Sequence, residues 1–380
     1  MKAPLIRHLD RLLPCLILIL VVGLIGGCSD ERRLESPVQF EGNIFGTFYQ
    51  ITVVDPLTEA QRAKLAAGIE ETLAHVDTSM STYREDSELM QLNRTPVGEW
   101  RELSPELTKV LHIARQVARK SDGAFDVTVG GLVNLWSFGP EARPQKVPDP
   151  ALLAERLQQV GQDRLELDVE GERARRLGDI FIDLSGVAKG YGVDRVADYL
   201  RRQGLENFLV NIGGELVLEG DRDDQGDPWR IGVEVPDVHQ RVAREVLPLH
   251  DATVATSGDY RNYFEAEGKR YSHTIDPRTG RPIDHALASV TVIHPDNAWA
   301  DAWATALMVL GPNEAMALAR RESLPILLLV RDGDGWSSRA SPAFIERFGK
   351  ERLEKMGVDT AQDRQSTSSK TAAGEPVVNQ

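Results

Sequence analysis

The stretch Ile182-Asp-Leu-Ser-Gly-Val-Ala-Lys-Gly-Tyr-Gly-Val-Asp194 is the most informative part of this chain. The β-branched run from Asp179 to Asp183 predicts a strand that ends at an acidic residue. Ser185-Gly186 predicts a tight turn, and the apolar spacing from Val187 onward predicts a helix with Lys189 in its first turn. Because the first amides of a helix have no partner within it, this arrangement suits a charged phosphate ligand.

The spacing around Lys189 differs from the common nucleotide motifs. A Walker loop has two glycines five residues apart followed by Lys-Ser or Lys-Thr, and a dinucleotide-binding turn has Gly-x-Gly-x-x-Gly. The pattern therefore indicates phosphate without indicating a common nucleotide fold. The alternative interpretation, an ordinary strand-to-helix turn with a surface lysine, stays open on these residues alone.

The N-terminus has the pattern of an export signal. Lys2, Arg7 and Arg11 precede the apolar run Leu12 to Leu24, which is short for a membrane span. Small residues before Cys28 resemble the bacterial lipoprotein cleavage site, which predicts a signal peptide over residues 1–27 and lipidation of Cys28. A plain secretory signal and an uncleaved anchor are the alternatives. Residues 28–39 are expected to form a tether.

Cysteine content and charge exclude several functions. Cys15 lies in the predicted signal and Cys28 is predicted to carry lipid, so the mature chain has no thiol for a disulfide or for catalysis. Subtracting Lys2, Arg7, Arg11 and Asp10 from the 44 basic and 58 acidic residues leaves 41 and 57, a net charge of −16. Such acidity argues against nucleic-acid binding. An anionic phosphate ligand would then need a local cation, most simply a divalent metal ion.

The middle of the chain predicts one α+β domain over residues 40–350. Helical and strand patterns alternate without a regular βαβ order, which favours α+β over a doubly wound sheet. Residues 351–380 are predicted to form a disordered tail, because Thr360 to Gln380 is polar and lacks periodicity. Helices are expected at 57–76, 104–123, 151–160, 187–203 and 297–310, with another from 312, and strands at 48–54, 208–218, 229–235, 252–255, 288–294 and 325–330.

Two groups of polar residues suggest chemistry. Asp301 and Thr305 are four apart on a predicted helix, so their oxygens share one face and suit Mg²⁺. The alternative is a surface Asp with a Thr bonded to the helix backbone. His273 precedes the turn sequence Thr-Ile-Asp-Pro-Arg-Thr-Gly280 and could act as a general base or as a hydrogen-bonding scaffold residue.

Eight segments in order carry a resemblance to a known family. They are FGTFY, STYR with DSELMQLN, GAFDVTVGGLVNLW, IDLSGVAKGYGVD, NIGGE, SGDY, SHTIDPRTGRP and ADAWATALMVLG, between about Phe45 and about Phe348. This set closely resembles the ApbE family of FAD:protein FMN transferases. The resemblance implies an ApbE-like fold with two lobes of mixed sheets and packed helices, and FAD in the cleft between them.

The resemblance also implies roles for residues of this chain. FAD would be contacted by Phe45, Tyr83, Ala124, Phe125, Asp126, Asp183, Lys189 and Ile275. Phe45 stands where the family often has methionine, and either side chain offers an apolar surface to a ring. Mg²⁺ would be bound by the carbonyl of Gly186, by Asp301 and by Thr305.

The implied reaction moves the FMN half of FAD onto a threonine hydroxyl of an acceptor protein and releases AMP. His273 is the first candidate for the base, and an aspartate near the metal, such as Asp301, is the second. The implied acceptors are subunits of respiratory complexes of the Na⁺-translocating NADH:quinone reductase and Rnf types. We therefore expect a lipid anchor in the inner membrane, facing the periplasm. An FAD storage protein and a Mg²⁺-dependent FAD pyrophosphatase are the alternative functions.

Overall fold

The protein has an α+β fold, as predicted, and its main element is one large sheet. The computed structural model describes residues 33–141, 144–235, 242–260, 262–333 and 335–361. The predicted signal peptide, Cys28 and most of the predicted tail lie outside these residues. Within them, no helix is both long and apolar enough to cross a bilayer.

Nine strands form the large sheet, and every neighbouring pair is antiparallel except the last, β17 with β18. In spatial order they are β1 (Val38–Ile44), β2 (Thr47–Val53), β6 (Phe208–Ile212), β7 (Glu215–Glu219), β10 (Ala252–Gly258), β15 (Leu287–His294), β16 (Ile326–Asp332), β17 (Gly335–Ala340) and β18 (Val358–Asp359).

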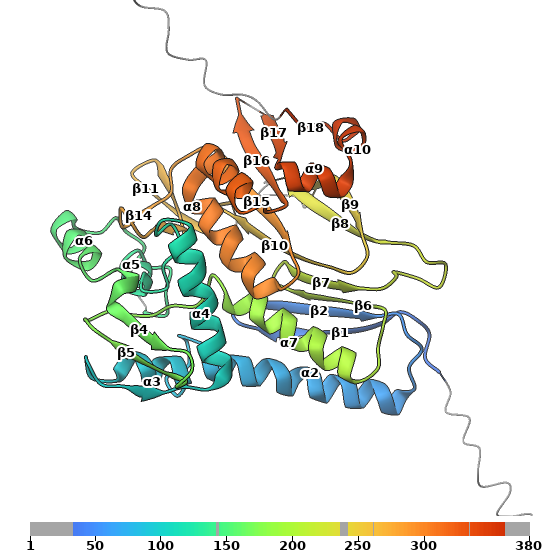
Figure 1. Cartoon of the computed structure of the whole chain (residues 1–380), viewed down its shortest axis with the longest axis horizontal. Helices are drawn as coiled ribbons and strands as arrows, with labels where there is room; N and C mark the ends of the chain where they lie inside the picture. Colours follow the sequence, from blue (N-terminus) through green and yellow to red (C-terminus); the bar gives the residue numbers. More distant parts are fainter. Residues whose placement is uncertain (1–32, 142–143, 236–241, 261, 334, 362–380) are drawn as a thin grey trace, which may run out of the picture.

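Three long helices cover one face of this sheet (Figure 1). They are α2 (Glu59–Met80), α7 (Ala188–Arg202) and α8 (Asn297–Arg321). Alternate residues of β2 and β6, among them Ile51 and Val210, are fully buried against α2 and α7. Gly311, at a φ of 74°, interrupts α8 before Pro312, which confirms the two helical segments expected there.

The opposite face of the sheet packs against the hairpin of β8 (Trp229–Val235) and β9 (Val242–Leu249). Leu216 and Val254 of the sheet share one buried cluster with Trp229 and Val233 of the hairpin. The helices α9 (Pro342–Phe348) and α10 (Lys350–Lys355) lie beside it and add Phe344 and Leu353 to the cluster. This hairpin therefore forms a second layer over the sheet.

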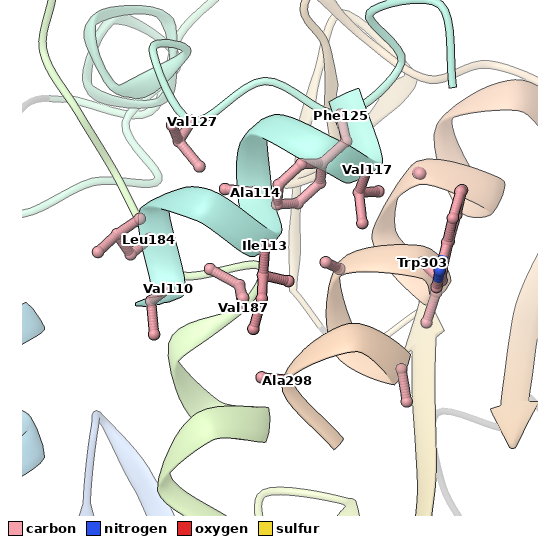
Figure 2. Packing of buried hydrophobic residues seen from close by; sticks show 14 of the residues in the cluster. Val110, Ile113, Ala114, Val117, Phe125, Val127, Leu184, Val187, Ala298 and Trp303 are labelled. Atoms are coloured by element: carbon pink, nitrogen blue, oxygen red, sulfur yellow. The ribbon is translucent and has the colours of Figure 1, made fainter. Parts of the chain in front are cut away.

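Smaller elements form the remainder and lie to one side of the large sheet (Figure 1). They include α3 (Glu88–Arg94), α4 (Pro105–Lys120), α5 (Gly130–Leu135), α6 (Pro150–Leu157), a 3₁₀ turn (Gln162–Arg164), and the sheet of β3 (Arg101–Glu102), β5 (Arg173–Arg176) and β4 (Leu165–Asp168). Two short hairpins pair β11 (Tyr263–Ala266) with β12 (Lys269–Ser272), and β13 (Ile275–Asp276) with β14 (Arg281–Pro282). Figure 2 shows Phe125 lying beside Ala114 and Val117 of α4.

Two predicted strands are corrected by the structure. The expected strand at 208–218 is a hairpin, because Gly213 and Gly214, at φ 63° and 108°, turn the chain between β6 and β7. The expected strand at 179–183 has only an isolated bridge, between Phe181 and Val129. The side chain of Asn93 takes the place of a strand neighbour there: its Nδ2 donates to the carbonyl of Ile182 and its Oδ1 accepts from the same residue's N–H.

Both predicted ends of the domain are also corrected. The expected tether at 28–39 includes part of β1, and the Leu34 N–H already donates to the Leu57 carbonyl at 2.7 Å. The expected tail from 351 contains most of α10 and all of β18, which pairs with β17. Hydrophobic contacts explain why the start of the expected tail is folded, since Leu353 and Val358 are buried in the cluster under the hairpin. The folded part therefore runs beyond 40–350 at both ends.

Candidate active site

One cavity of about 1050 Å³ opens between the large sheet, the hairpin and the smaller elements. It is lined by every residue that we predicted to bind flavin or metal or to move a proton, although these come from segments far apart in the sequence. They are Phe45, Tyr83, Ala124, Phe125, Asp126, Asp183, Gly186, Lys189, His273, Ile275, Asp301 and Thr305.

A charged cluster lies where α7 meets α8. The Lys189 Nζ is 2.9 Å from Glu215 Oε1 and 3.2 Å from Asp301 Oδ1, and the Gly190 N–H donates to Asp301 Oδ2 at 3.0 Å. The side chains of Glu215 and Asp301 are 4% and 2% exposed, so both carboxyl groups contact the lysine within the wall of the cavity. Burial alone would lower the pKa of Lys189, but Asp301 and Glu215 outweigh it, and the net pKa is raised.

Glu215 is a member of this cluster that the sequence did not assign. Burial raises its pKa to about 7, with Lys189 lowering it and Asp301 raising it further. Its Oε2 atom is buried and has no hydrogen-bond partner among the described residues. The available signal was its position directly after Gly213-Gly214, a glycine pair inside the segment 208–218 that the sequence predicts as one strand.

Gly186 and Thr305 lie against each other beside this cluster. A Cβ atom at Gly186 would lie 3.2 Å from Thr305 Oγ1 and 3.0 Å from the Phe125 ring, so the turn approaches α8 too closely for most side chains. Within the described residues, no three His, Cys, Asp or Glu side chains are grouped to hold a metal. A metal here would therefore need the main-chain and hydroxyl oxygens of Gly186 and Thr305 in addition to Asp301.

This donor set fits Mg²⁺. Carboxylate, hydroxyl and carbonyl oxygens are the hard ligands that Mg²⁺ prefers, with water or substrate phosphate completing the shell. The unpartnered Oε2 of Glu215 is a further buried oxygen in the same cluster. The residues present thus suit the predicted ion, and the assignment of Gly186, Asp301 and Thr305 as ligands remains a prediction.

Gly190 sets the distance between α7 and α8. A Cβ atom there would lie 2.4 Å from the carbonyl oxygen of Asn297 and 2.8 Å from the Asp301 Cβ. Real atoms do not approach so closely, and the collision is with backbone, so the two helices would have to separate. The absence of a side chain at Gly190 therefore holds Asp301 within reach of Lys189.

We expect Gly190→Ala to destabilise the protein by about 1–3 kcal/mol through overpacking, although alanine favours helix. Thermal unfolding followed by circular dichroism would measure it. Gly131→Ala is the matched control, because Gly131 also lies in a helix and a Cβ there meets nothing within 4 Å. A Gly190→Ala protein as stable as the Gly131→Ala protein would contradict the close approach.

His273, which lies just before β13, is oriented by the backbone carbonyl of Asn262, just before β11. Its Nδ1 is 2.9 Å from the carbonyl oxygen of Asn262, and a carbonyl can only accept, so Nδ1 carries the proton. Nε2 then has a free lone pair in the neutral ring. Burial is the largest influence on the pKa of His273 and lowers it, which favours this neutral form at pH 7. The geometry is that of a general base.

The predicted flavin contacts differ in exposure. Tyr83 follows α2 and is 72% exposed, whereas Ala124 and Phe125 are buried at 1% and 4%. Burial raises the pKa of Asp126, whose Oδ1 also accepts from the N–H and hydroxyl of Thr128. An exposed ring at the opening and apolar groups at depth suit a flat aromatic ligand.

Phe45 is held in an unusual backbone conformation. It has a φ of 53° and forms the two-residue turn between β1 and β2 with Gly46, at φ 71°. Two positive φ angles are typical of the turn that best matches strand twist, but a phenylalanine there costs about 1–3 kcal/mol. Such strain occurs preferentially at functional sites, which agrees with the predicted ligand contact.

The comparisons with known proteins agree with this geometry. A profile of the ApbE family matches residues 45–328. The chain is 44% identical to an FAD:protein FMN transferase of Vibrio cholerae, over 84% of this chain and 95% of that protein, and 40% identical to one of Haemophilus influenzae, over 88% and 98%.

Solved structures give the same result for the fold. The flavin transferase ApbE from Vibrio cholerae superposes with a TM-score of 0.76 at 41% identity, covering 83% of this chain and 100% of that one. The apo form of the Pseudomonas stutzeri flavinyl transferase ApbE gives 0.75 at 38% identity, covering 83% and 97%.

Proposed function

Because this chain belongs to the ApbE family and is a flavin transferase, we propose that it transfers FMN from FAD to a threonine hydroxyl of an acceptor protein, with Mg²⁺ as cofactor and AMP as the second product. The observation that supports this most strongly is the cluster of Lys189, Asp301 and Glu215 beside Gly186 and Thr305 in the cavity.

The proposed reaction exchanges the phosphoanhydride bond of FAD for a phosphoester bond to threonine. The threonine Oγ attacks the phosphorus on the flavin side of the pyrophosphate. The bond from that phosphorus to the bridging oxygen breaks, and the electron pair leaves with AMP. The threonine proton passes to Nε2 of His273, whose Nδ1–H stays bonded to Asn262. An aspartate of the cluster is the second candidate for this base.

Charge explains why the site contains both a lysine and carboxylates. The pyrophosphate repels a nucleophile, and AMP departs as an anion. Mg²⁺, when bound by Gly186, Asp301 and Thr305, would neutralise phosphate charge. Lys189 supplies a further positive charge, and Glu215 holds its Nζ in place. Phe45, Tyr83, Ala124, Phe125, Asp126, Asp183 and Ile275 would hold the rest of FAD in this cavity.

The proposal is tested by incubating the protein with FAD, Mg²⁺ and a flavin-free Rnf-type subunit. We expect a fluorescent acceptor band after denaturing electrophoresis and an equal amount of AMP. Removal of divalent ions with EDTA should reduce labelling by about 10³-fold, since one preorganised charge contact is worth about 10²–10³ in rate and the ion makes several. Added Mg²⁺ should restore it.

The same experiment separates the alternative functions. Free FMN and AMP without a labelled acceptor would indicate an FAD pyrophosphatase. FAD that is bound but unchanged would indicate a storage protein. Replacing the acceptor's threonine by alanine is the control, and continued labelling of that variant would contradict transfer to a hydroxyl.

We also propose that the protein is anchored by lipid at Cys28 in the inner membrane and faces the periplasm. The proposal rests on the positively charged start, the apolar run and the small residues before Cys28. The proposed acceptors, subunits of NADH:quinone reductase and Rnf-type complexes, would lie in the same membrane. Mass spectrometry of the membrane fraction would detect an acylated Cys28 at the N-terminus of the mature protein.

A further inference from the structure

The strand β8 has one paired edge and one open edge. Within the part of the chain that the structure describes, its only strand neighbour is β9. Arg230, Ile231, Gly232 and Val233 all line the cavity, whereas none of the residues of β9 whose side chains are described, 246–249, does. Successive residues of a strand point to opposite faces, so a continuous run of lining residues indicates that the strand borders the cavity along its edge. The open edge of β8 therefore faces the cavity.

The register of the hairpin shows which backbone groups lie at this edge. Arg230 is opposite Pro248 and Gly232 is opposite Val246. Pro248 has no N–H to donate, which favours a pair without hydrogen bonds at that position. The N–H and C=O groups of Arg230, and of Gly232 two residues on, then point away from β9. Gly232 carries no side chain to keep another backbone at a distance.

This edge borders a part of the cavity with no predicted FAD contact. Its wall on the large sheet includes Gln50 and Thr52 of β2 and Leu209 and Asn211 of β6. Gln50 is opposite Asn211 and Thr52 is opposite Leu209, so this wall leads along the strands away from the turn before Glu215. The cavity thus continues past the charged cluster, between the sheet and β8.

We propose that the acceptor protein binds here as an extended segment that adds a strand to the open edge of β8 and brings its threonine to His273. The inference rests on the proposed function, since a protein hydroxyl has to reach the pyrophosphate. An extended strand lies about 4.8 Å from its neighbour, whereas a helix is about 10–12 Å wide. A cavity that also holds FAD has room for the strand rather than the helix.

Binding through main-chain groups would also suit more than one acceptor. Hydrogen bonds to a strand edge do not depend on side chains, and specificity then comes from pockets for alternate residues. An open strand edge can pair with another chain and cause aggregation. Proteins usually protect such edges with charged side chains, with proline, or with a helix or loop that covers them. The edge of β8 is instead turned into the cavity, where only a segment that enters the site can pair with it.

The test compares Gly232→Pro with Gly232→Ala, using the flavin-free Rnf-type subunit as acceptor. Proline removes the N–H at the open edge and leaves the ladder to β9 intact, whereas alanine keeps the N–H. We expect proline to raise the KM for the acceptor about tenfold, the value of one to two hydrogen bonds. FAD affinity, measured by quenching of flavin fluorescence, should not change. Arg230→Pro should act in the same way.

Hydrogen exchange on the wild-type protein provides a measurement that needs no variant. The acceptor should slow exchange in peptides covering 229–235, whereas FAD with Mg²⁺ alone should not. An unchanged acceptor KM in the folded proline variants, or unaltered exchange when the acceptor is bound, would overturn the strand proposal. Wild-type protein that labels no acceptor would instead overturn the proposed function, so the two failures are distinct.

Discussion

Asp301→Ala is expected to lower the rate of AMP release and of acceptor labelling by about 10³-fold, because it removes a proposed metal ligand and the partner of Lys189. Asp301 is 2% exposed, and its carboxylate also accepts from the Gly190 N–H. Removing one side of a buried ion pair costs about 3–5 kcal/mol, and the remaining contact of Lys189 with Glu215 should keep the loss near the lower value.

Asp301→Asn separates the loss of the negative charge from the loss of the hydrogen bond to Gly190. The amide oxygen can still accept from the Gly190 N–H, so the α7–α8 contact should persist with a smaller loss of melting temperature than in the alanine variant. The negative charge is gone, so we expect labelling to be lost in both variants. In-gel fluorescence and thermal unfolding measure the two properties on the same samples. An asparagine variant that labels the acceptor at the wild-type rate would exclude Asp301 as a metal ligand.

His273→Asn is expected to lower the rate constant for transfer by about 10²–10⁴-fold, the usual contribution of a general base. The asparagine amide can donate to the Asn262 carbonyl as Nδ1 does, so the loop should keep its conformation. FAD affinity should therefore be unchanged, which flavin fluorescence measures. Equal rates of FMN transfer by the wild-type protein and the His273→Asn variant would show that His273 is a scaffold residue.

The pH dependence of the transfer rate tests independently whether His273 is the base. The pKa of His273 is lowered by burial, so the neutral base is present at pH 7 and activity should fall only as pH decreases below about 6.5. Since the folded pKa lies below the unfolded one, native stability should also decrease as pH falls through this range. His273→Asn should lack the acidic limb. A limb that persists in the variant would assign the proton to the second candidate, an aspartate of the cluster.

The sequence predicted helices and strands correctly where the apolar residues follow a single period, either that of a helix or that of a strand. The helix at 57–76 has its apolar residues at Leu65, Ile69, Leu73 and Val76, and all of them are buried in α2. The strand expected at 179–183 is absent for a reason outside the segment, because the Asn93 side chain takes both backbone hydrogen bonds of Ile182 and only Phe181 forms a bridge, with Val129. β1 was missed because its alternating pattern is short and lies at the sheet edge.

The candidate site was predicted through motifs, and its geometry required the fold. Lys189 and Asp301 are far apart in the sequence, and their distance of 3.2 Å depends on the missing side chain at Gly190. Glu215 could not be assigned from the sequence, because its partner becomes visible only when the β6–β7 hairpin is placed beside α7. The open edge of β8 likewise follows from strand pairing rather than from any motif.

The contact between Leu34 and Leu57 has a consequence for where the enzyme can work. Arg33, the first residue that the structure describes, already bridges to Thr58, so only the stretch from Cys28 to Arg33 lies between this bridge and the proposed acyl chains. Fully extended, this stretch from Cys28 to Arg33 spans at most about 18 Å. The catalytic body would therefore stay close to the lipid headgroups, and a substrate domain held far above the bilayer by a long stalk would be out of range.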